Sequence, residues 1–386
     1  MNSFIEKKFG KFYHPIVWNC KRFWKYKIIY PFFYKQKVKN TSVEPNKVVI
    51  YTRDYEKMSP SFEKINFLLK VKNYNVIIKN KLKSNNDEKE FIKEIVSAKF
   101  IIINQDCTII NILPIREETK VINLWHGCGA LKKFGCSKMQ SWNNMFYPYK
   151  RFNNYSLFTV SSDKVLSYYE EATKIKFERN ILKAVGISRT DIFFEPVFLE
   201  LCNRKKITLT NKKIILYAPT MRGTDLSAAY TPEFINFELL KEKLSNEYIF
   251  LVKRHPDTLD KPYSIPKSCK DFVFDVSEDG SISELIVMSD ILVSDYSSLF
   301  FEWCLFDKPV LFLTPDFEDY FDNRGFYIDF KSIVDKARCN TTQELVSAIQ
   351  NIDAYDFSFV KQVRDDYMSS CDGHSTERIV ELMENL

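Results

Sequence analysis

Residues 289–330 constrain the fold of this chain more than any other stretch. Their pattern predicts a buried strand at 291–293, a helix at 299–306 and a second apolar strand at 310–313. Two strands joined through a helix form a βαβ unit, in which the strands are parallel. Parallel sheets are covered by helices on both faces, so this stretch predicts an α/β protein.

The turn between the first strand and the helix is rich in hydroxyl and carboxyl groups. It contains Asp295, Ser297 and Ser298, just before the helix or in its first turn. A helix N-terminus exposes unpaired N–H groups and the positive end of the helix dipole, and it therefore binds phosphate. Ser and Asp are also the usual capping residues of helices that bind no ligand. The turn is thus interpreted either as an ordinary N-cap or as a phosphate site.

The alternation of strands and helices extends over most of the chain. Apolar runs predict first-half strands at 47–51, 75–78, 100–103, 120–124 and 157–161, and second-half strands at 214–217, 249–252, 272–274, 291–293, 310–313 and 337–339. Helical spacing predicts helices at 61–72, 88–98, 163–173, 234–244, 282–288, 299–306, 343–352 and 359–383, and the polar, basic stretch 196–212 suggests a linker. A chain of 386 residues suits two domains. We therefore expect two α/β halves with binding sites at the carboxyl ends of the strands.

Two of the four histidines follow predicted strands and stand beside unusual turns. His126 comes shortly after the strand 120–124 and is followed by Gly127, Cys128 and Gly129. The glycines allow the backbone to approach a ligand closely. An imidazole in such a loop either caps a helix or acts as a general base, and its place at a strand end favours the base.

The second half collects positive charge at its strand ends. Arg222 follows one predicted strand, and Lys253, Arg254 and His255 follow another. Together with the hydroxyl-rich turn, this charge suits a diphosphate. We expect a cleft between the halves in which His126 takes a proton from an attacking hydroxyl and His255 stabilises or protonates a leaving phosphate. The pattern predicts a transferase that uses a nucleotide-diphosphate donor.

Several nucleotide and metal motifs are missing from the sequence. The chain has nine glycines and neither GxGxxG nor GxxxxGK[ST], which argues against a glycine-rich phosphate loop. It has no DxD motif and no glycosidase-like pair of carboxylates, and its nine scattered cysteines form no CxxC pair. We therefore expect no cofactor and no obligatory metal, with free thiols in a reducing cytoplasm.

Residues 1–40 differ in composition from the rest of the chain. They hold nine Lys and one Arg against one Glu, with many Phe, Tyr and Trp, although the net charge of the whole chain is +6. This composition is typical of a segment in the headgroup layer of an anionic membrane. The alternatives are a helix-rich arm packed on the body and, less favoured, a nucleic-acid arm. Since there is no signal peptide and no run of 18 apolar residues, we expect a peripheral protein on the cytoplasmic face of the membrane. Because the membrane interpretation of residues 1–40 is favoured, we expect no nucleic-acid partner.

Several motifs resemble those of one known family. They are NLWHGCGALKKFG (123–135), ILYAPTMRG (215–223), VKRHP (252–256), VSDYSSLFFEW (293–303) and RGFYIDF (324–330). In this order they resemble the CDP-glycerol glycerophosphotransferase family, which builds teichoic acids and related polyol-phosphate capsules. VGISRTDIFF (185–194) and DGHSTERIVELM (372–383) resemble further segments, so the resemblance covers residues 45–386.

The resemblance implies a GT-B fold, with two Rossmann-like domains, a cleft between them and a C-terminal helix crossing back to the first domain. The implied division is a basic aromatic segment with membrane contact (1–40), an acceptor domain (41–200), a CDP-donor domain (201–355) and a helical segment packing back on the acceptor domain (356–386). The implied reaction transfers glycerol phosphate or ribitol phosphate from a CDP-activated polyol to a hydroxyl of a lipid-linked or polymer acceptor and releases CMP. These motifs leave open whether the polyol is glycerol or ribitol and whether the protein is a primase or a polymerase. They also leave open the number of subunits.

Matching the motifs residue by residue assigns a role to each candidate. His126 and His255 match the histidines proposed to be catalytic in the family. The remaining candidates are the donor and phosphate residues Arg222, Lys253, Arg254, Ser297 and Ser298, the pocket-shaping or ribose-contacting Asp295 and Glu302, and the acceptor-loop residues Gly127, Gly129 and Lys132. Where the family usually has Thr-Pro after His-Gly, this chain has Cys128 and Gly129, which leaves the choice of polyol and acceptor open.

Two other functions are compatible with parts of this pattern. A GT-B glycosyltransferase that uses a sugar nucleotide in surface polysaccharide synthesis would share the fold and the cleft. A membrane-associated scaffold without catalysis would keep only the fold, and the intact His126 and His255 argue against it.

Overall fold

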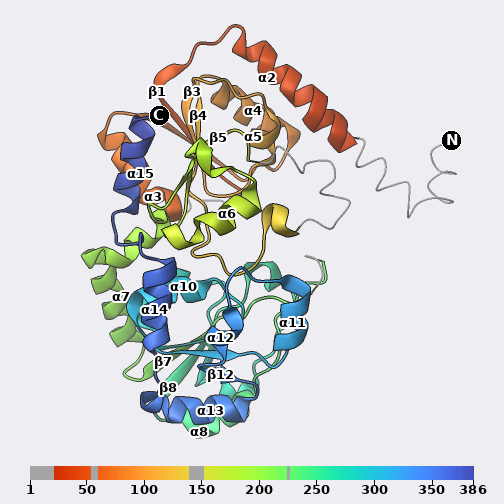
Figure 1. Ribbon diagram of the computed structural model, residues 1–386. Helices are drawn as coiled ribbons and strands as arrows, with labels where there is room; N and C mark the ends of the chain where they lie inside the picture. Colours follow the sequence, from red (N-terminus) through yellow and green to blue (C-terminus); the bar gives the residue numbers. More distant parts are fainter. Residues whose placement is uncertain (1–20, 54–59, 139–151, 224–226) are drawn as a thin grey trace, which may run out of the picture.

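The computed structural model describes residues 21–53, 60–138, 152–223 and 227–386. In this part of the chain the strands form two parallel sheets of six strands each. One sheet with its helices forms the upper half of the molecule in Figure 1, and the other forms the lower half. The predicted α/β class is confirmed.

The first sheet uses strands from the first half of the sequence. Its strands are β1 (Glu44–Thr52), β2 (Asn75–Asn80), β3 (Ala98–Ile103), β4 (Lys120–Asn123), β5 (Tyr155–Thr159) and β6 (Leu182–Lys183), in the order β2-β1-β3-β4-β5-β6. Its helices are α3 (Pro60–Val71), α4 (Asn85–Val96), α5 (Thr108–Ile112) and α6 (Leu166–Thr173). All neighbouring strands are parallel, as expected when each strand is followed by a helix.

Strand β1 shows how helices cover both faces of this sheet. Successive side chains of a strand point to opposite faces. Val48 and Ile50 pack in one apolar cluster with the inner side of α3. Val49 and Tyr51 belong to a second cluster that includes Phe91 of α4. The sheet is therefore buried on both faces, which explains its nearly continuous apolar runs.

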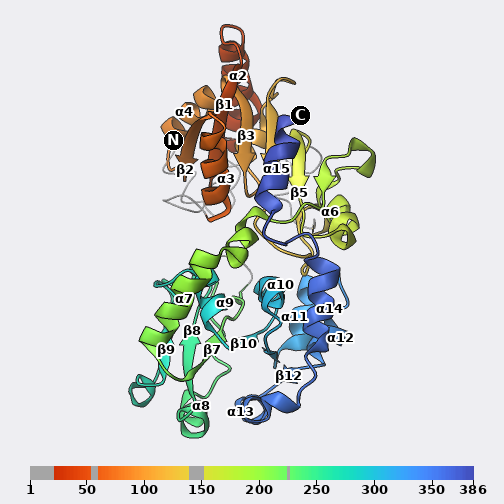
Figure 2. The same cartoon turned by 90° about the vertical axis from the view of Figure 1, so that its left-hand side faces the viewer.

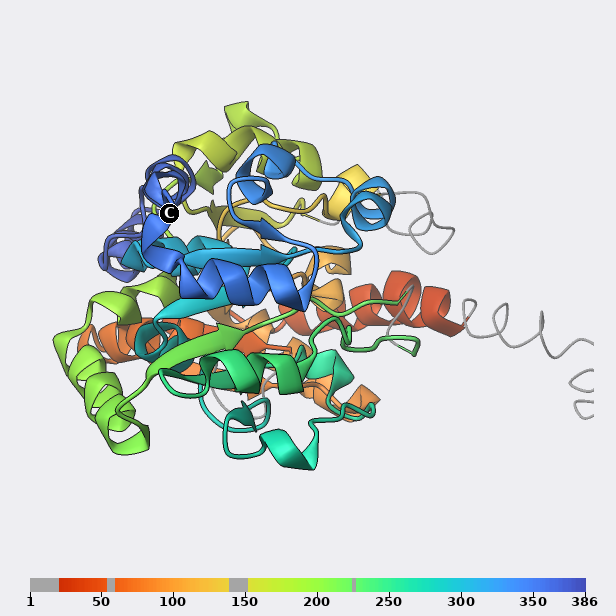
Figure 3. The same cartoon turned by 90° about the horizontal axis from the view of Figure 1, so that it is seen from below.

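The second sheet has the same layered construction. Its strands are β7 (Lys213–Tyr217), β8 (Tyr248–Val252), β9 (Val273–Asp275), β10 (Ile291–Ser294), β11 (Val310–Leu313) and β12 (Arg338–Cys339). Its helices are α8 (Phe237–Leu244), α9 (Ile282–Met288), α10 (Leu299–Trp303), α11 (Phe317–Arg324), α12 (Phe330–Val334) and α13 (Thr342–Gln350). Helices α8 and α13 lie together at the lower end of this half, nearest the viewer in Figure 3.

The strand order of the second sheet locates a binding crevice. The order is β9-β8-β7-β10-β11-β12, so the first strand of this half, β7, lies beside the fourth, β10. Consecutive connections leave in opposite directions from these two strands, and ligands of open α/β sheets bind outside the carboxyl ends of the strands at that reversal. Residues that follow β7 and β10 are therefore the first place to look for a site.

Two predicted elements differ from the structure. The linker predicted at 196–212 is wrong, because Pro196–Leu209 form helix α7. Only Cys202 of this helix is buried, so its sequence lacks the apolar stripe that signals a packed helix. The single helix predicted at 359–383 is divided into α14 (Ser358–Tyr367) and α15 (Ser375–Glu384). Gly373 stands at the break with φ +91°, a conformation that favours glycine.

Helix α15 ends the chain but packs on the first half. Its Ile379, Val380 and Met383 join the cluster between α3 and the first sheet, whereas α14 contacts α10 in the second half. Figure 2 shows α15 beside α3 in the upper half and α14 in the lower half. The buried carboxylate of Asp191 accepts hydrogen bonds from the first N–H groups of α15, at 3.0 and 2.7 Å.

The described part of the basic aromatic segment packs on the body with one face. It forms a π-helix (Trp24–Ile29) and α2 (Tyr30–Val38). The hydroxyls of Tyr26 and Tyr30 donate to the carboxylate of Glu88 at 2.8 and 2.6 Å. The opposite face exposes the apolar side chains of Phe23, Trp24, Ile28, Ile29 and Phe32.

The first twenty residues of the predicted 1–40 segment lie outside the described residues. Within the described ranges, no helix has the length and apolar character needed to cross a bilayer.

Candidate functional site

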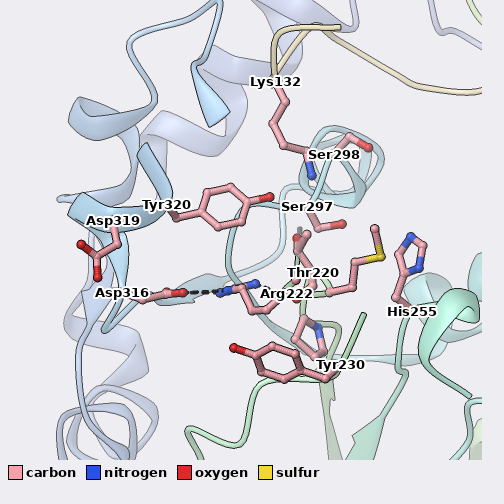
Figure 4. A pocket seen from close by; sticks show the side chains of 13 residues that line it. Lys132, Thr220, Arg222, Tyr230, His255, Ser297, Ser298, Asp316, Asp319 and Tyr320 are labelled. Carbon is pink, nitrogen blue, oxygen red and sulfur yellow. Dashed lines mark hydrogen bonds and ion pairs between the residues drawn. The ribbon is translucent and has the colours of Figure 1, made fainter. Parts of the chain in front are cut away.

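A cavity of about 720 Å³ lies at the strand reversal of the second sheet and extends to the first half. Figure 4 shows most of its lining side chains around Arg222. The first half contributes Lys132, and the second half contributes Pro219, Thr220, Met221, Arg222, Gly223, Tyr230, His255, Ser297, Ser298, Asp316, Asp319 and Tyr320. Small-molecule sites typically have volumes of about 300–1,000 Å³. The cavity is thus large enough for a nucleotide-linked substrate.

Arg222 lies on the cavity wall but is almost wholly engaged by neighbouring groups. Its Nε and one terminal nitrogen donate to Asp316 at 2.7 and 3.2 Å. The other terminal nitrogen donates to Asp295 at 2.9 Å and to the carbonyl of Thr220 at 2.6 Å. Burial alone would lower the pKa of Arg222, but the bonds to Asp316 and Asp295 raise it, so the guanidinium stays charged. Arg222 therefore links the segments that form the wall of the cavity.

Asp295 acts from beneath the cavity. Its buried carboxylate accepts from the backbone N–H of Thr220 at 2.8 Å and from that of Tyr296 at 2.6 Å, in addition to Arg222. This carboxylate joins the segment after β7 to the segment after β10. Asp295 is absent from the cavity lining, so its position suits the predicted shaping role better than contact with a ribose.

Ser297 and Ser298 both line the cavity, and they differ in their bonding. The Ser297 hydroxyl accepts from the backbone N–H of Leu299 at 3.3 Å, which is a weak cap. Ser298 occupies the N-cap position of α10 without a side-chain capping bond. The helix predicted at 299–306 consists of α10 (Leu299–Trp303) followed by a 3-10 turn (Cys304–Phe306). Because α10 is short, its macrodipole is small. The two hydroxyls are consequently the more important donors of this turn.

His255 lines the cavity from the end of β8. Its Nδ1 accepts from the backbone N–H of Asp257 at 3.2 Å, so in the neutral ring the proton is on Nε2. Burial lowers the pKa of His255 below its ordinary value; nearby Asp257 opposes this shift and Lys132 adds to it. His255 is therefore a neutral N–H donor at neutral pH.

Lys253 and Arg254, which the sequence predicts to contact phosphate, are absent from the cavity lining. The Lys253 ammonium donates to the carbonyls of Val276, Ser277 and Gly280 at 3.1, 3.0 and 3.0 Å. Burial lowers the pKa of Lys253, and nearby carboxylates offset this only in part. These bonds fix the loop after β9 beside β8.

Arg254 holds the backbone on the other side of His255. It donates to the Asp275 carboxylate at 3.1 Å and to the carbonyls of Thr258 and Lys261 at 3.2 and 3.3 Å. In this structure both cations support the loops on which His255 stands.

His126 is an exposed residue in the loop after β4, next to the buried Trp125. The preceding Trp125 has φ +55°, a strained value for a large side chain, which turns the chain sharply here. His126 Nδ1 lies 3.2 Å from the carbonyl oxygen of Asn104. A carbonyl can only accept, so Nδ1 carries the proton and Nε2 carries the lone pair. His126 therefore has the tautomer required of a general base, although it does not line the cavity itself.

The glycine loop after His126 packs against the second half. Gly129 has φ +59°, and a Cβ at this position would lie 2.5 Å from the Phe301 ring of α10. Gly127 has no such contact, since its nearest neighbour would be Trp125 at 3.6 Å. Cys128 is buried beside this interface, and burial raises the pKa of its thiol. The Cys-Gly pair thus lets the two halves approach closely.

Glu302 also belongs to this interface. Its buried carboxylate pairs with Arg189, whose Nε donates at 2.7 Å from the 3-10 helix Ser188–Phe194 of the first half. Glu302 is absent from the cavity lining. Its position supports a structural role between the halves rather than contact with a ribose.

Eight of the described lining residues were not among the candidates named from the sequence. They are Pro219, Thr220, Met221, Gly223, Tyr230, Asp316, Asp319 and Tyr320. Asp316 follows β11 after two residues, so the rule that sites lie at carboxyl strand ends could have identified it. The Thr220 hydroxyl is buried and has no hydrogen-bond partner, a state that a bound ligand would relieve. Nothing in the local sequence distinguishes Tyr230, which reaches the wall through mutual backbone bonds with Arg222 at 2.9 and 3.0 Å.

The described residues show no group of three or more His, Cys, Asp or Glu side chains arranged to hold a metal ion.

Comparison with known proteins gives consistent matches. The family model of the CDP-glycerol:poly(glycerophosphate) glycerophosphotransferases matches residues 19–385. A teichoic acid poly(ribitol-phosphate) polymerase of Bacillus spizizenii is 31% identical over 351 residues, covering 88% of this chain and 56% of the relative. A teichoic acid glycerol-phosphate primase of Bacillus subtilis is 30% identical over 350 residues, covering 88% of this chain and 84% of the relative. The chain thus spans little more than half of the polymerase and most of the primase.

One group of solved structures shares the fold. The wall teichoic acid polymerase TagF superposes with a TM-score of 0.77 at 20% identity, covering 97% of this chain and 96% of the other. At this identity the likeness concerns the fold alone.

Proposed function

Because the chain belongs to the CDP-glycerol:poly(glycerophosphate) glycerophosphotransferase family, we propose that it transfers a polyol phosphate, glycerol phosphate or ribitol phosphate, from a CDP-polyol to an acceptor hydroxyl. The acceptor is a lipid-linked or polymer chain in teichoic acid or capsule synthesis, and CMP is released. The relatives from the two Bacillus species, a ribitol-phosphate polymerase and a glycerol-phosphate primase, support both the reaction and its acceptor class.

One observation carries the proposal: the two histidines present opposite tautomers. His126 bears its lone pair on Nε2, because Nδ1 faces the Asn104 carbonyl. His255 bears its proton on Nε2, because Nδ1 accepts from Asp257. Phosphoryl transfer to a hydroxyl needs a base for the nucleophile and a donor for the leaving group. In their neutral forms the two rings would supply one of each.

The reaction then proceeds by attack on phosphorus. The acceptor oxygen forms a bond to the phosphorus that carries the polyol, and its proton passes to His126 Nε2. The bond from that phosphorus to the bridging oxygen breaks, and CMP leaves with the electron pair. His255 Nε2–H and the hydroxyls of Ser297 and Ser298 donate to the oxygens on which negative charge develops.

The arrangement of the halves supports a GT-B organisation with a cleft between two Rossmann-like domains. The cavity has lining residues from both sheets. Helix α15 joins the first half although it follows the second in sequence. We assign the acceptor domain to 41–200, the donor domain to 201–355 and the returning segment to 356–386.

Donor and product analysis tests the proposed function. Purified protein is incubated with CDP-glycerol, CDP-ribitol and a panel of sugar nucleotides, each with a synthetic lipid acceptor, and products are identified by mass spectrometry. We expect CMP and an acceptor that is heavier by one or more polyol phosphates. Transfer of a sugar with release of a nucleoside diphosphate, or no turnover of any CDP-polyol, would overturn the proposal.

We also propose that the basic aromatic segment binds an anionic membrane surface from the cytoplasmic side. The exposed apolar side chains include Trp24 and Phe32, and the segment 21–39 carries seven lysines and arginines. Exposed aromatics insert at the interface while cations contact lipid phosphate. The inner face is already used, since Tyr30 and Tyr34 are buried.

Liposome sedimentation tests the membrane contact without removing the packed helix. Trp24→Ser and Phe32→Ser are compared with Phe67→Ser, which removes an equally exposed ring from α3 (64% exposed, against 61% for Trp24 and 62% for Phe32). We expect the first two variants to weaken binding to anionic vesicles and the third to bind like the wild type. Equal binding by all three would exclude this surface.

A further inference from the structure

Lys132 stands on the first half but reaches the cavity of the second. The segment 131–133 forms an interdomain pairing with the segment 325–327. Lys133 N–H donates to the Gly325 carbonyl at 3.1 Å, and Tyr327 N–H donates to the Leu131 carbonyl at 3.0 Å. Lys132 itself forms an antiparallel bridge with Phe326. This pairing fixes the backbone of Lys132 at the mouth of the cavity.

Aromatic contacts hold the interdomain pairing in place. The ring of Tyr327 stacks on Tyr168 of α6, with centroids 5.3 Å apart, and meets Phe134 edge-on at 5.9 Å. Gly325 has φ +70°, which favours glycine, and a Cβ there would lie 3.3 Å from the Lys133 side chain. The position of Lys132 therefore depends on a glycine in the other half of the molecule.

The charge balance of the cavity makes this placement informative. Among the described residues of the lining, Lys132 is the lysine and Arg222 the arginine, and the guanidinium of Arg222 is bonded to Asp295 and Asp316. Asp319 lies on the same wall as Asp316. A diphosphate brings negative charge into this cavity, and an ammonium group within reach of it would offset that charge.

The surroundings of Lys132 match the position of a diphosphate. In Figure 4 its side chain descends from the first half towards Ser297 and Ser298. It is near enough to His255 that its positive charge helps to lower the pKa of that imidazole. The ammonium, the two hydroxyls and the imidazole N–H thus surround one region of the cavity.

We propose that Lys132, assigned to the acceptor loop by resemblance, is a donor-binding residue that contacts the diphosphate, and that the interdomain pairing delivers it there. The donor then touches both halves, so its binding stabilises their closed arrangement. This inference rests on the proposed function, because a diphosphate-linked donor is what the cation would recognise.

Calorimetry with CDP and with cytidine separates a diphosphate contact from a general effect on the pocket. The variants are Lys132→Met and the matched control Lys133→Met, whose side chain does not line the cavity. We expect Lys132→Met to weaken CDP binding about 10- to 100-fold, the range for loss of a charge-assisted hydrogen bond. The cytidine affinity and the thermal unfolding temperature of Lys132→Met should differ little from those of the wild type. Lys132→Arg should retain most of the CDP affinity. Lys133→Met should bind CDP like the wild type.

A double-mutant cycle tests delivery by the pairing. Gly325→Ala should weaken CDP binding in the wild-type background and have no further effect in the Lys132→Met background. Additive effects would show that Gly325 acts through α11 instead, and would overturn the delivery step. If the wild type releases CMP from a CDP-polyol while Lys132→Met binds CDP normally, this inference fails and the proposed function stands. If the wild type turns over no CDP-polyol, the proposed function itself is overturned.

Discussion

The carboxyl edges of the two sheets differ in how their functional side chains are held. At the second sheet, Arg222, Asp295 and Asp316 are bonded to one another, and the loops beside His255 are fastened by Lys253 and Arg254. At the first sheet, His126 is exposed in a glycine-containing loop, with its Nδ1 3.2 Å from a backbone carbonyl and its ring beside that of Trp125. The second edge is thus preorganised for a ligand, while the first presents a reactive group.

This difference shows that cations at the ends of neighbouring strands can have structural partners within their own half. The three cations predicted to bind phosphate, Arg222, Lys253 and Arg254, are engaged with carboxylates or carbonyls of their own half. The cation that the cavity receives from the opposite half is Lys132. In the proposed donor complex the ligand contacts both halves, so we expect donor binding and the approach of the halves to be coupled.

The largest effect should follow removal of the exposed group at the first edge. His126→Ala is expected to reduce polyol-phosphate transfer by about 10²- to 10⁴-fold, the usual contribution of a positioned acid or base. CDP affinity should remain within a few fold, because His126 lies outside the cavity lining. His374→Ala, at an exposed histidine before α15, is the matched control and should retain full turnover. Full turnover by His126→Ala would exclude it as the base.

The opposite pattern is expected at the second edge, where Arg222→Ala should mainly reduce stability. Arg222 is 8% exposed and paired with two carboxylates. Removing one partner of a buried ion pair leaves uncompensated charge, so the free energy of unfolding should fall by about 3–5 kcal/mol. CDP binding should weaken as the wall loosens. Urea denaturation and calorimetry measure the two effects, and weaker CDP binding at unchanged stability would show that Arg222 contacts the donor directly.

The strand pattern was predictable from the sequence because burial on both faces produces continuous apolar runs. The strand 310–313, for example, was predicted with the bounds of β11. Helix α7 was not predictable, because one buried side chain leaves no apolar stripe. Similarly, β6 (Leu182–Lys183) is too short to give a periodic signal.

The sequence identified lining residues best where the residue type has few structural uses. It was less informative about the roles of individual cations. The sequence named His255, Ser297, Ser298, Arg222 and Lys132, all of which line one cavity. It did not separate Arg222 from Lys132, because the pairing of Arg222 with Asp316 joins residues 94 positions apart. The pairing of Arg222 with two carboxylates depends on such tertiary contacts.

A smaller effect is expected where the two edges touch, at Gly129. An alanine there would place its Cβ 2.5 Å from the Phe301 ring, in a backbone conformation with φ +59°. Overpacking of this kind costs about 1–3 kcal/mol of the free energy of unfolding. Gly127→Ala, with its nearest neighbour at 3.6 Å, should change stability by less than about 0.5 kcal/mol. Equal losses in the two variants would show that the halves do not meet at Gly129.

The smallest effect concerns the charge state of His255 and needs NMR titration of the imidazole. In the free protein, burial and Lys132 keep the pKa of His255 below its ordinary 6.5 despite the opposing effect of Asp257. Bound CDP adds negative charge and should raise that pKa. Cytidine, which lacks the diphosphate, should leave it almost unchanged.

The same lowered pKa sets the sign of a pH effect on stability. Between the pKa of the folded state and about 6.5, the unfolded chain binds more protons at this position than the folded protein does. The contribution of His255 to stability should therefore rise with pH across this window and become constant above it. His255→Gln should remove that slope. A slope of the opposite sign would mean that His255 is paired with a carboxylate. A titration unaffected by CDP would mean that His255 does not face the diphosphate.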